Sequence, residues 1–352
     1  VGKDSLSMRT QWQDASGKAQ KVTSPVSLIV SAFATVDDVR GTLTPQLNRE
    51  EAETHLLLID LGRGKNRMSG SILSQVLGQG GAMGDGGVPD LDDAQDLVNL
   101  VKAINALRNQ NQILAYHDRS DGGLLACAAE MAFAGHVGVA LNVDMLLTPT
   151  GAANDGRIDS GEAKNWGQQI SGLRHEQTLR ALFNEELGVV LQVRSGERSA
   201  VMQVLREHDL GACSHFIGTV RAESSSLDMG KGQLSIWRDA QQIFSASLHE
   251  LHQLWDSVSW KICQLRDNPA CADSEHAARG VAGDPGMHVH LTFTPEAPAI
   301  LASRPRVAVL REQGVNSHVE MAYAFDRAGF ETFDVHMTDL QAGRVRLKDM
   351  QG

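Results

Sequence analysis

Residues 116–135 read YHDRSDGGLLACAAEMAFAG and place several polar side chains directly before an alanine-rich apolar run. Asp118 offers a carboxylate, Ser120 offers a hydroxyl, and the glycine pair that follows offers unshielded backbone N–H groups. Carboxylate oxygen suits a hard cation such as Mg²⁺, and the free amides at a helix start suit phosphate. The pattern indicates a Mg-nucleotide site. Alternatively, Ser120 or Asp121 only caps the helix and the glycines only form its turn.

Two basic loops are further candidates for phosphate binding. VGKDSLSM (1–8) sets Lys3 beside a glycine and two serines, but it lacks the Ser or Thr that follows the lysine of a Walker A loop. RGKNRMSGS (63–71) sets Lys65 and Arg67 among glycines before a helix. We take Lys3 as a candidate nucleotide ligand. The alternatives are a hairpin with an exposed lysine and a turn with ordinary surface bases.

The remaining ionisable residues and thiols give weaker signals. Glu185 and Glu186 are adjacent in LFNEELG, and adjacent carboxylates rarely converge on one atom, so a metal or acid–base role competes with a solvated helix end. The four cysteines are far apart and lack CxxC spacing, which indicates reduced thiols. Cys263, Cys271 and His276 lack metal-ligand spacing and are predicted to be structural.

Alternating strand and helix patterns position the first motif. A strand is predicted over 55–62 and another over 113–118, which brings Asp118 to a carboxyl strand end, where α/β-type sheets bind ligands. Between them lies a helix with one apolar face, made of Leu97, Val98, Val101, Ile104 and Leu107. Strands that alternate with helices indicate an α/β or α+β domain.

Composition divides the chain into four parts. Residues 1–50 are predicted to hold the end of a mixed sheet, and 51–250 an α+β domain with a surface insertion at 148–176. Over 251–303, prolines and polar residues interrupt the periodicity, which predicts a linker. Residues 304–352 open a new unit.

The last unit begins with a strand–helix–strand pattern. RVAVL, HVEMAYAFDRAG and ETFDV follow one another over 306–335 and predict the first βαβ of a doubly wound sheet. Ser317 and Glu320 have capping-box spacing, and Gly329 stands where a left-handed C-cap belongs.

Overall composition excludes some classes of function. The 352 residues carry a formal net charge of −11 without a cluster of Lys and Arg, which disfavours nucleic-acid binding. Neither a long apolar stretch nor a signal-peptide pattern is present, so we expect a cytoplasmic protein without a membrane partner. Because the chain starts at Val1 inside a motif and stops at Gly352, we expect an internal fragment.

Five motifs together resemble one family. VGKDSLSM, HDRSDGGLLACAAEMAFAG, LFNEELG, QLRDNPACADSEH and RPRVAVLREQGVNSHVEMAYAFDRAGF resemble, in order, the large single-chain phosphoribosylformylglycinamidine synthases, or formylglycinamide ribonucleotide amidotransferases. The resemblance spans nearly the whole chain, and 148–176 is longer than the family's usual connection. It implies the end of an aminoimidazole-ribonucleotide-synthetase-like N-terminal subdomain, its C-terminal α+β subdomain, and the start of a flavodoxin-like class I glutamine amidotransferase domain.

The resemblance also implies a reaction in purine biosynthesis. Formylglycinamide ribonucleotide, glutamine and ATP give formylglycinamidine ribonucleotide, glutamate, ADP and phosphate, with Mg²⁺ as cofactor. Asp118 matches the family's magnesium position and Ser120 an ATP-binding position. Other segments of the same polypeptide would hold the catalytic histidine and the glutaminase cysteine.

All four cysteines precede the strand at 306–310, so we predict no glutaminase activity for this chain alone. Two alternatives remain. One is a non-catalytic nucleotide-binding module of the same enzyme. The other is a different ATP-using member of the superfamily, such as aminoimidazole ribonucleotide synthetase or selenophosphate synthetase. The additional strand–helix–strand unit at 306–335 argues against this second alternative.

Overall fold

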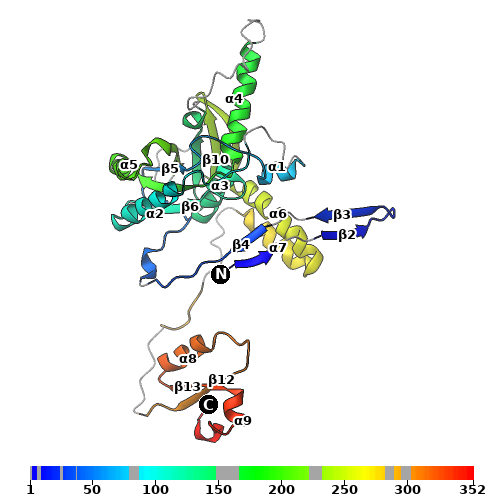
Figure 1. The fold of residues 1–352 in the computed structure, drawn as a ribbon, viewed down its shortest axis with the longest axis vertical. Coiled ribbons are helices and arrows are strands. Elements are labelled where there is room, and N and C mark those ends of the chain that lie inside the picture. Colours follow the sequence, from blue (N-terminus) through cyan, green and yellow to red (C-terminus); the bar gives the residue numbers. More distant parts are fainter. Residues whose placement is uncertain are drawn as a thin grey trace. The chain divides into compact units, whose positions relative to one another are not determined.

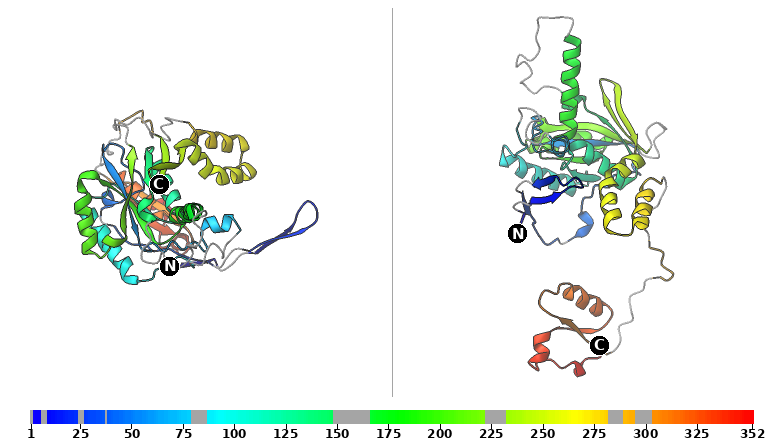
Figure 2. Two further views of the ribbon diagram at one scale, coloured as in Figure 1. Left: turned by 90° about the horizontal axis from the view of Figure 1, so that it is seen from above. Right: turned by 90° about the vertical axis from the view of Figure 1, so that its right-hand side faces the viewer.

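The chain forms two compact units, Val1–Asp284 and Pro285–Gly352, in a computed structural model. Figures 1 and 2 show its ribbon from three sides. The structure describes residues 2–5, 9–23, 27–36, 38–78, 87–147, 166–221, 232–281, 289–294 and 303–352. Within these ranges, only the backbone is described for 2–5, Val22, 27–29 and 166–170.

A seven-stranded mixed sheet forms the centre of the first unit, in the order β11-β10-β7-β9-β5-β8-β6. The strands are β5 (Thr54–Asp60), β6 (Ala115–Asp118), β7 (Gly138–Asn142), β8 (Gly188–Arg194), β9 (Ser214–Arg221), β10 (Gln233–Arg238) and β11 (Gln241–Ser247). The β7–β10 pair is parallel and the other neighbouring pairs are antiparallel. The predicted strands at 55–62 and 113–118 are thereby confirmed, with slightly shorter bounds.

Helices cover both faces of this sheet (Figure 1). The helices of the first unit are α1 (Ile72–Val76), α2 (Ala94–Asn109), α3 (Gly123–Gly135), α4 (Trp166–Phe183), α5 (Arg198–Glu207), α6 (Leu248–Arg266) and α7 (Pro269–Arg279). Because side chains alternate along β5, Leu56 and Leu58 join the core under α3 and α4, whereas Leu57 and Ile59 join the core under α2 and α5. Burial on both faces explains the continuous apolar run of this strand.

Short elements complete the chain. The 3₁₀ turns are η1 (Val39–Gly41), η2 (Asp144–Leu146), η3 (Ser195–Glu197), η4 (Gly211–Cys213) and η5 (Leu347–Asp349). Near the N-terminus, β1 (Gly2–Ser5) pairs with β4 (Ser27–Val30), and β2 (Arg9–Gln13) pairs with β3 (Ala19–Thr23), both antiparallel. The predicted end of a mixed sheet is thus two small two-stranded sheets in the described residues.

The second unit contains the predicted βαβ pattern. Its elements are β12 (Arg306–Arg311), α8 (His318–Arg327), β13 (Glu331–His336) and α9 (Met337–Gln341). β12 and β13 run parallel, as a crossover helix requires, and Gly329 has the expected positive φ of 94°. The predicted capping box is wrong: Ser317 lies in the left-handed region at φ 66°, and its side chain makes no capping hydrogen bond.

The predicted linker at 251–303 is wrong over its first part, because α6 and α7 occupy 248–279. Polar contacts join the two helices. His276 Nδ1 lies 2.9 Å from Asp256 Oδ2, and the His276 ring stacks on Trp260 at 4.1 Å between centroids. Hydrophobic periodicity does not reveal contacts of this kind, an ion pair and a ring stack. The structural role predicted for His276 agrees with these contacts.

Two further expectations are corrected. On the predicted apolar face of α2, Leu107 is buried and Ile104 packs against the core, whereas Leu97, Val98 and Val101 are exposed. Leu100 and Ala103 complete the buried face. Residues 148–165 of the predicted insertion lie outside the described residues, and 166–176 form the first part of α4. None of the helices in the described ranges combines the length and apolar composition that crossing a membrane requires.

Candidate functional site

Asp118 is the last residue of β6, the edge strand of the large sheet. It stands opposite Val189, and Asp60 at the end of β5 stands opposite Gly188, so both carboxylates lie at the same end of the sheet. Asp118 is exposed, and its Oδ1 accepts a hydrogen bond of 2.6 Å from the Tyr116 hydroxyl. Its Oδ2 has no hydrogen-bond partner among the described residues and is free to bind a ligand.

The turn after Asp118 requires both glycines. Gly122 and Gly123 have φ of 84° and 71°, and a Cβ on Gly123 would lie 2.7 Å from the carbonyl oxygen of Asn184. The N-cap of α3 is Gly122, with no side-chain capping bond, so neither Ser120 nor Asp121 caps the helix. The glycine-turn part of the alternative is confirmed and the capping part is wrong. Ser120 is exposed beside Asp118.

Glu185 holds the starts of two helices together. Its Oε1 accepts hydrogen bonds from the backbone N–H of Ile72, 2.8 Å away, and of Gly122, 2.9 Å away. The amide of Gly123 donates to the carbonyl of Ser120. The amides that the sequence suggested for phosphate are therefore already bonded, one of them to a carboxylate. The solvated helix end expected for Glu185 is wrong.

Glu186 forms a buried ion pair with Arg67. Its side chain is 0% exposed, its Oε1 accepts from Arg67 Nε at 2.7 Å, and its Oε2 accepts from Arg67 Nη2 at 2.7 Å. These bonds raise the pKa of Arg67. Arg67 is thus not available to a phosphate, because its guanidinium holds the 63–71 loop to Glu186, two residues before β8. Lys65 remains half-exposed and pairs with Asp92 at 2.9 Å.

Arg119 anchors the motif from inside. Its side chain is 1% exposed and donates to Asp60 Oδ1 at 2.5 Å and to the carbonyl oxygen of Glu186 at 2.6 Å. Asp60 also accepts from the amides of Gly62 and Gly64. The inward Arg119 therefore leaves Asp118 and Ser120 on the outside. Sequence reasoning missed this role, for which the only signal was an arginine between two outward-facing polar residues.

His117 faces the opposite side of the sheet from Asp118, as strand alternation dictates. Its Nε2 lies 2.9 Å from Glu130 Oε2 on α3, and Glu130 Oε1 accepts from Trp255 Nε1 on α6. The Glu130 carboxylate raises the pKa of His117, which in turn lowers the pKa of Glu130. His117 is therefore a packing residue that joins β6 to two helices.

Lys3 lies in β1, opposite Ile29 of β4. Its side chain is outside what the structure describes, so its place at a nucleotide site remains a prediction.

Comparison with known families identifies the order of domains. Residues 1–35 match the model of the FGAR-AT PurM_N-like domain, 56–229 that of the AIR synthase related protein, C-terminal domain, and 304–352 that of the CobB/CobQ-like glutamine amidotransferase domain. Together, the three matches support a fragment of a formylglycinamide ribonucleotide amidotransferase. Asp118, Ser120 and their supporting residues all lie in the AIR-synthase-related domain of that family.

Solved structures also align with the chain. Thermotoga maritima PurL complexed with ATP has 10% identity over 66% of this chain and 28% of its own length, with a TM-score of 0.39. The same protein complexed with FGAR has 12% identity over 60% and 30%, with a TM-score of 0.38. HypE from E. coli, a hydrogenase maturation protein, has 19% identity over 58% and 52%, with a TM-score of 0.33. The chain thus spans about a third of the length of the PurL chains that it matches.

The side chains near Asp118 that could ligate a metal ion determine which kind of metal site can form in this domain. Among the described residues, no three His, Cys, Asp or Glu side chains lie close enough to hold a metal ion together. Mg²⁺ in nucleotide sites takes one or two carboxylates, with phosphates and water completing the shell. Asp118, with one unpaired oxygen, fits a cation that arrives with a nucleotide and does not fit a self-contained metal centre.

Proposed function

We propose that this chain contributes part of the nucleotide site of an ATP-dependent carbon–nitrogen ligase. The reaction is that of the family: formylglycinamide ribonucleotide, glutamine and ATP give formylglycinamidine ribonucleotide, glutamate, ADP and phosphate in de novo purine biosynthesis, in the cytoplasm. The observation that carries this proposal is the succession of the three domain matches along one chain. A synthetase domain activates its substrate with ATP, and an amidotransferase domain releases ammonia from glutamine. Their succession in one chain therefore fits a ligase that uses both.

Within this reaction, Asp118 would ligate Mg²⁺ through Oδ2, and Ser120 would hydrogen-bond the nucleotide. Bound Mg²⁺ supplies neutralisation of the charge on the phosphates. Two residues of this chain position the side chains of Asp118 and Ser120. Arg119 anchors the end of β6 by its buried hydrogen bond to Asp60, and Glu185 accepts hydrogen bonds from the amides of Gly122 and of Ile72 at the start of α1. Because the Gly122 and Gly123 amides are occupied, we expect the phosphates at the Asp118–Ser120 side of the turn. Lys3 is a further proposed contact.

The test is an activity assay on the enzyme that contains this segment. We expect ADP and amidine formation to require formylglycinamide ribonucleotide, Mg²⁺, and glutamine or ammonia. Asp118→Asn should lower the rate at limiting Mg-ATP, whereas Asp121→Asn, an exposed carboxylate of the same turn, should not. ATP hydrolysis that is independent of the ribonucleotide would contradict the proposal. A bound ADP that survives many turnovers would instead assign this segment to the non-catalytic module.

A further inference from the structure

A cavity of about 430 Å³ lies at the same end of the sheet as Asp118, and neither Asp118 nor Ser120 lines it. Leu58 and Asp60 of β5 border it on the face that packs against α3 and α4. By alternation along β6, Asp118 shares the other face with Tyr116, which packs toward α2 and α5. Arg119, the residue between Asp118 and Ser120, also lines the cavity, so the cavity adjoins the proposed nucleotide site without including either of those two residues. Its volume falls within the range of small-molecule sites.

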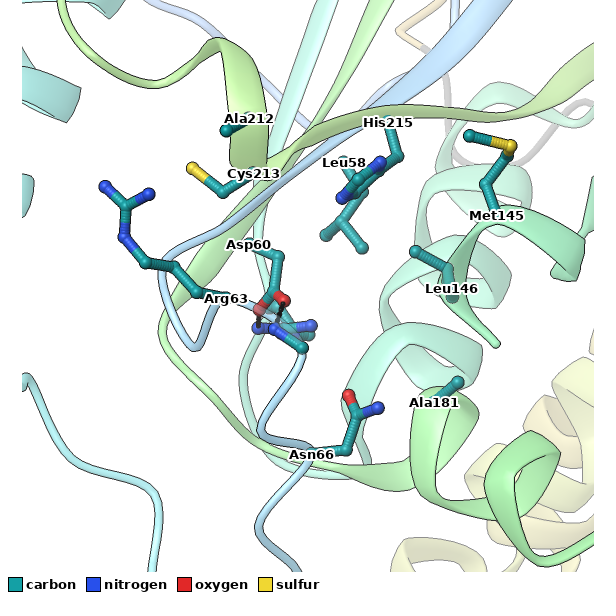
Figure 3. Close-up of a pocket in the computed structure, with 12 residues that line it drawn as sticks. Leu58, Asp60, Arg63, Asn66, Met145, Leu146, Ala181, Ala212, Cys213 and His215 are labelled. Atoms are coloured by element: carbon teal, nitrogen blue, oxygen red, sulfur yellow. Dashed lines mark hydrogen bonds and ion pairs between the residues drawn. The ribbon is translucent and has the colours of Figure 1, made fainter. Parts of the chain in front are cut away.

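Apolar side chains form its walls. Leu58 contributes from the sheet, Met145 and Leu146 from η2, and Ala181 from α4. In Figure 3, His215 and Asn66 lie at opposite ends of the space that these residues border. Met145 is 59% exposed, and its flexible thioether can pack against an aromatic ring at the opening.

The charged groups of the lining are already paired within the protein. Asp60 accepts from Arg119, Gly62 and Gly64. Arg63 donates two hydrogen bonds, of 2.7 and 2.9 Å, to Asp96, and its side chain points away from η2 in Figure 3. No cation of the described lining is therefore left to bind a phosphate or carboxylate.

The polar groups left for a ligand are neutral. The side chain of His215 makes no hydrogen bond to another described residue. Its partial burial lowers its pKa, so at neutral pH the ring offers one donor and one acceptor. Asn66 accepts from Asn184 through Oδ1, which leaves its Nδ2 as a donor toward the cavity. Burial also raises the pKa of the Cys213 thiol to about 11 and keeps it uncharged.

We propose that this cavity binds a neutral planar heteroaromatic ring, the chemical class of the nucleobases. Such a ring lies between the apolar walls and presents donors and acceptors along its edge to His215 and Asn66. Anionic ligands are disfavoured because every cation of the lining is already paired. The proposal goes beyond the proposed ligase function, because neither Asp118 nor Ser120 lines this cavity.

Adenine is the probe for the test, because it is neutral, planar and carries both donors and acceptors. Titration of the chain with adenine should shift the His215 ring signals in heteronuclear NMR saturably, and inorganic phosphate should not reverse the shift. In calorimetric titrations with adenine, His215→Leu should weaken binding about tenfold, the value of one lost hydrogen bond in a buried site. The matched control is His290→Leu, at an exposed histidine outside the cavity, which should leave binding unchanged.

A second variant distinguishes a lost contact with adenine from a misfolded protein. Asn66→Asp keeps the acceptor for Asn184 and removes the free donor, so it should also weaken binding while circular dichroism stays unchanged. Asp118→Asn should leave adenine binding at His215 intact, which separates this proposal from the proposed ligase site. The proposal is overturned if His215 shows no saturable change, if phosphate displaces adenine, or if His215→Leu and His290→Leu bind adenine equally.

Discussion

Gly123 has no room for a side chain, because the turn that follows Asp118 packs closely against the end of α4 at this position. A Cβ at this position would lie 2.7 Å from the carbonyl oxygen of Asn184 and 2.8 Å from that of Leu182, at a φ of 71°. We predict that Gly123→Ala lowers the free energy of unfolding by about 2 kcal/mol or more, from backbone strain plus overpacking.

Gly172 provides the matched control for this substitution. It lies in α4 with nothing within 4 Å of its ideal Cβ position, so Gly172→Ala should stabilise the helix by about 0.5–1 kcal/mol. Urea unfolding of the two variants measures both effects. Equal unfolding midpoints for Gly123→Ala and the unmodified chain would show that the turn tolerates a side chain.

The His117–Glu130 pair predicts a pH dependence. The pKa of His117 is raised by Glu130, so its contribution is complete below its unfolded pKa near 6.5 and is lost as pH rises through the raised folded value. The pKa of Glu130 is lowered from 4.5, so its contribution is lost as pH falls below that value. The pair therefore stabilises the fold most between about pH 4.5 and 6.5.

An NMR titration of the His117 ring checks this dependence. We expect a midpoint above 6.5 in the unmodified chain and a lower midpoint in Glu130→Gln, in which the carboxylate is absent. A His117 midpoint at or below 6.5 in the unmodified chain would rule the ion pair out.

For some residues of the candidate site the sequence predicted the position in the fold, and for others it did not. Asp118 could be placed because a carboxylate at the end of a recognisable strand has one expected position. The roles of Glu185 and Arg119 could not be predicted, because their hydrogen bonds reach residues 63 and 59 positions away in the chain, Gly122 and Asp60. The spacing of residues within a short motif does not reveal contacts with residues so far away in the sequence.

The basic 63–71 loop is attached to the sheet by the buried Arg67–Glu186 pair. We predict that Arg67→Met lowers the free energy of unfolding by about 3–5 kcal/mol, because Glu186 is left buried and unpaired. The double variant Arg67→Met/Glu186→Leu should recover part of that loss. Arg266 is the control: it pairs with Asp267 at the surface, so Arg266→Met should cost about 0–1 kcal/mol. Chemical denaturation that shows equal losses for Arg67→Met and Arg266→Met would contradict the burial argument.

Prediction of the helices succeeded where apolar side chains decide the packing and failed where polar ones do. The alanine-rich run of α3 is buried as its composition suggests. On α2, Asp96 pairs with Arg63 and turns inward, so the face with Leu97 and Val98 points outward despite its apolar character. Hydrophobic periodicity selects the face that contains Leu97 and Val98 because the pattern takes no account of a specific ion pair such as Asp96–Arg63.

The two units of the whole chain differ in how their strands are supported. β5 is hydrogen-bonded on both sides, by β8 and β9, and buried on both faces, whereas β12 and β13 form a sheet of two strands. Two-stranded sheets are marginal in water. We therefore predict that amides of β12 and β13 exchange with deuterium much faster than those of β5, measured by mass spectrometry. Equal protection in the two units would show that the second unit is stabilised in a way its described contacts do not explain.

Asp118 is the carboxylate on which the proposed Mg-nucleotide site depends. Its most direct test is calorimetric titration of the chain with Mg-ATP, repeated for Asp118→Asn and for the control Asp121→Asn. We predict that Asp118→Asn weakens Mg-ATP binding by about 1–3 kcal/mol, the cost of losing a charged partner, and that Asp121→Asn leaves it unchanged. Equal affinities for the unmodified chain and Asp118→Asn, with identical circular dichroism, would contradict the assignment of the site.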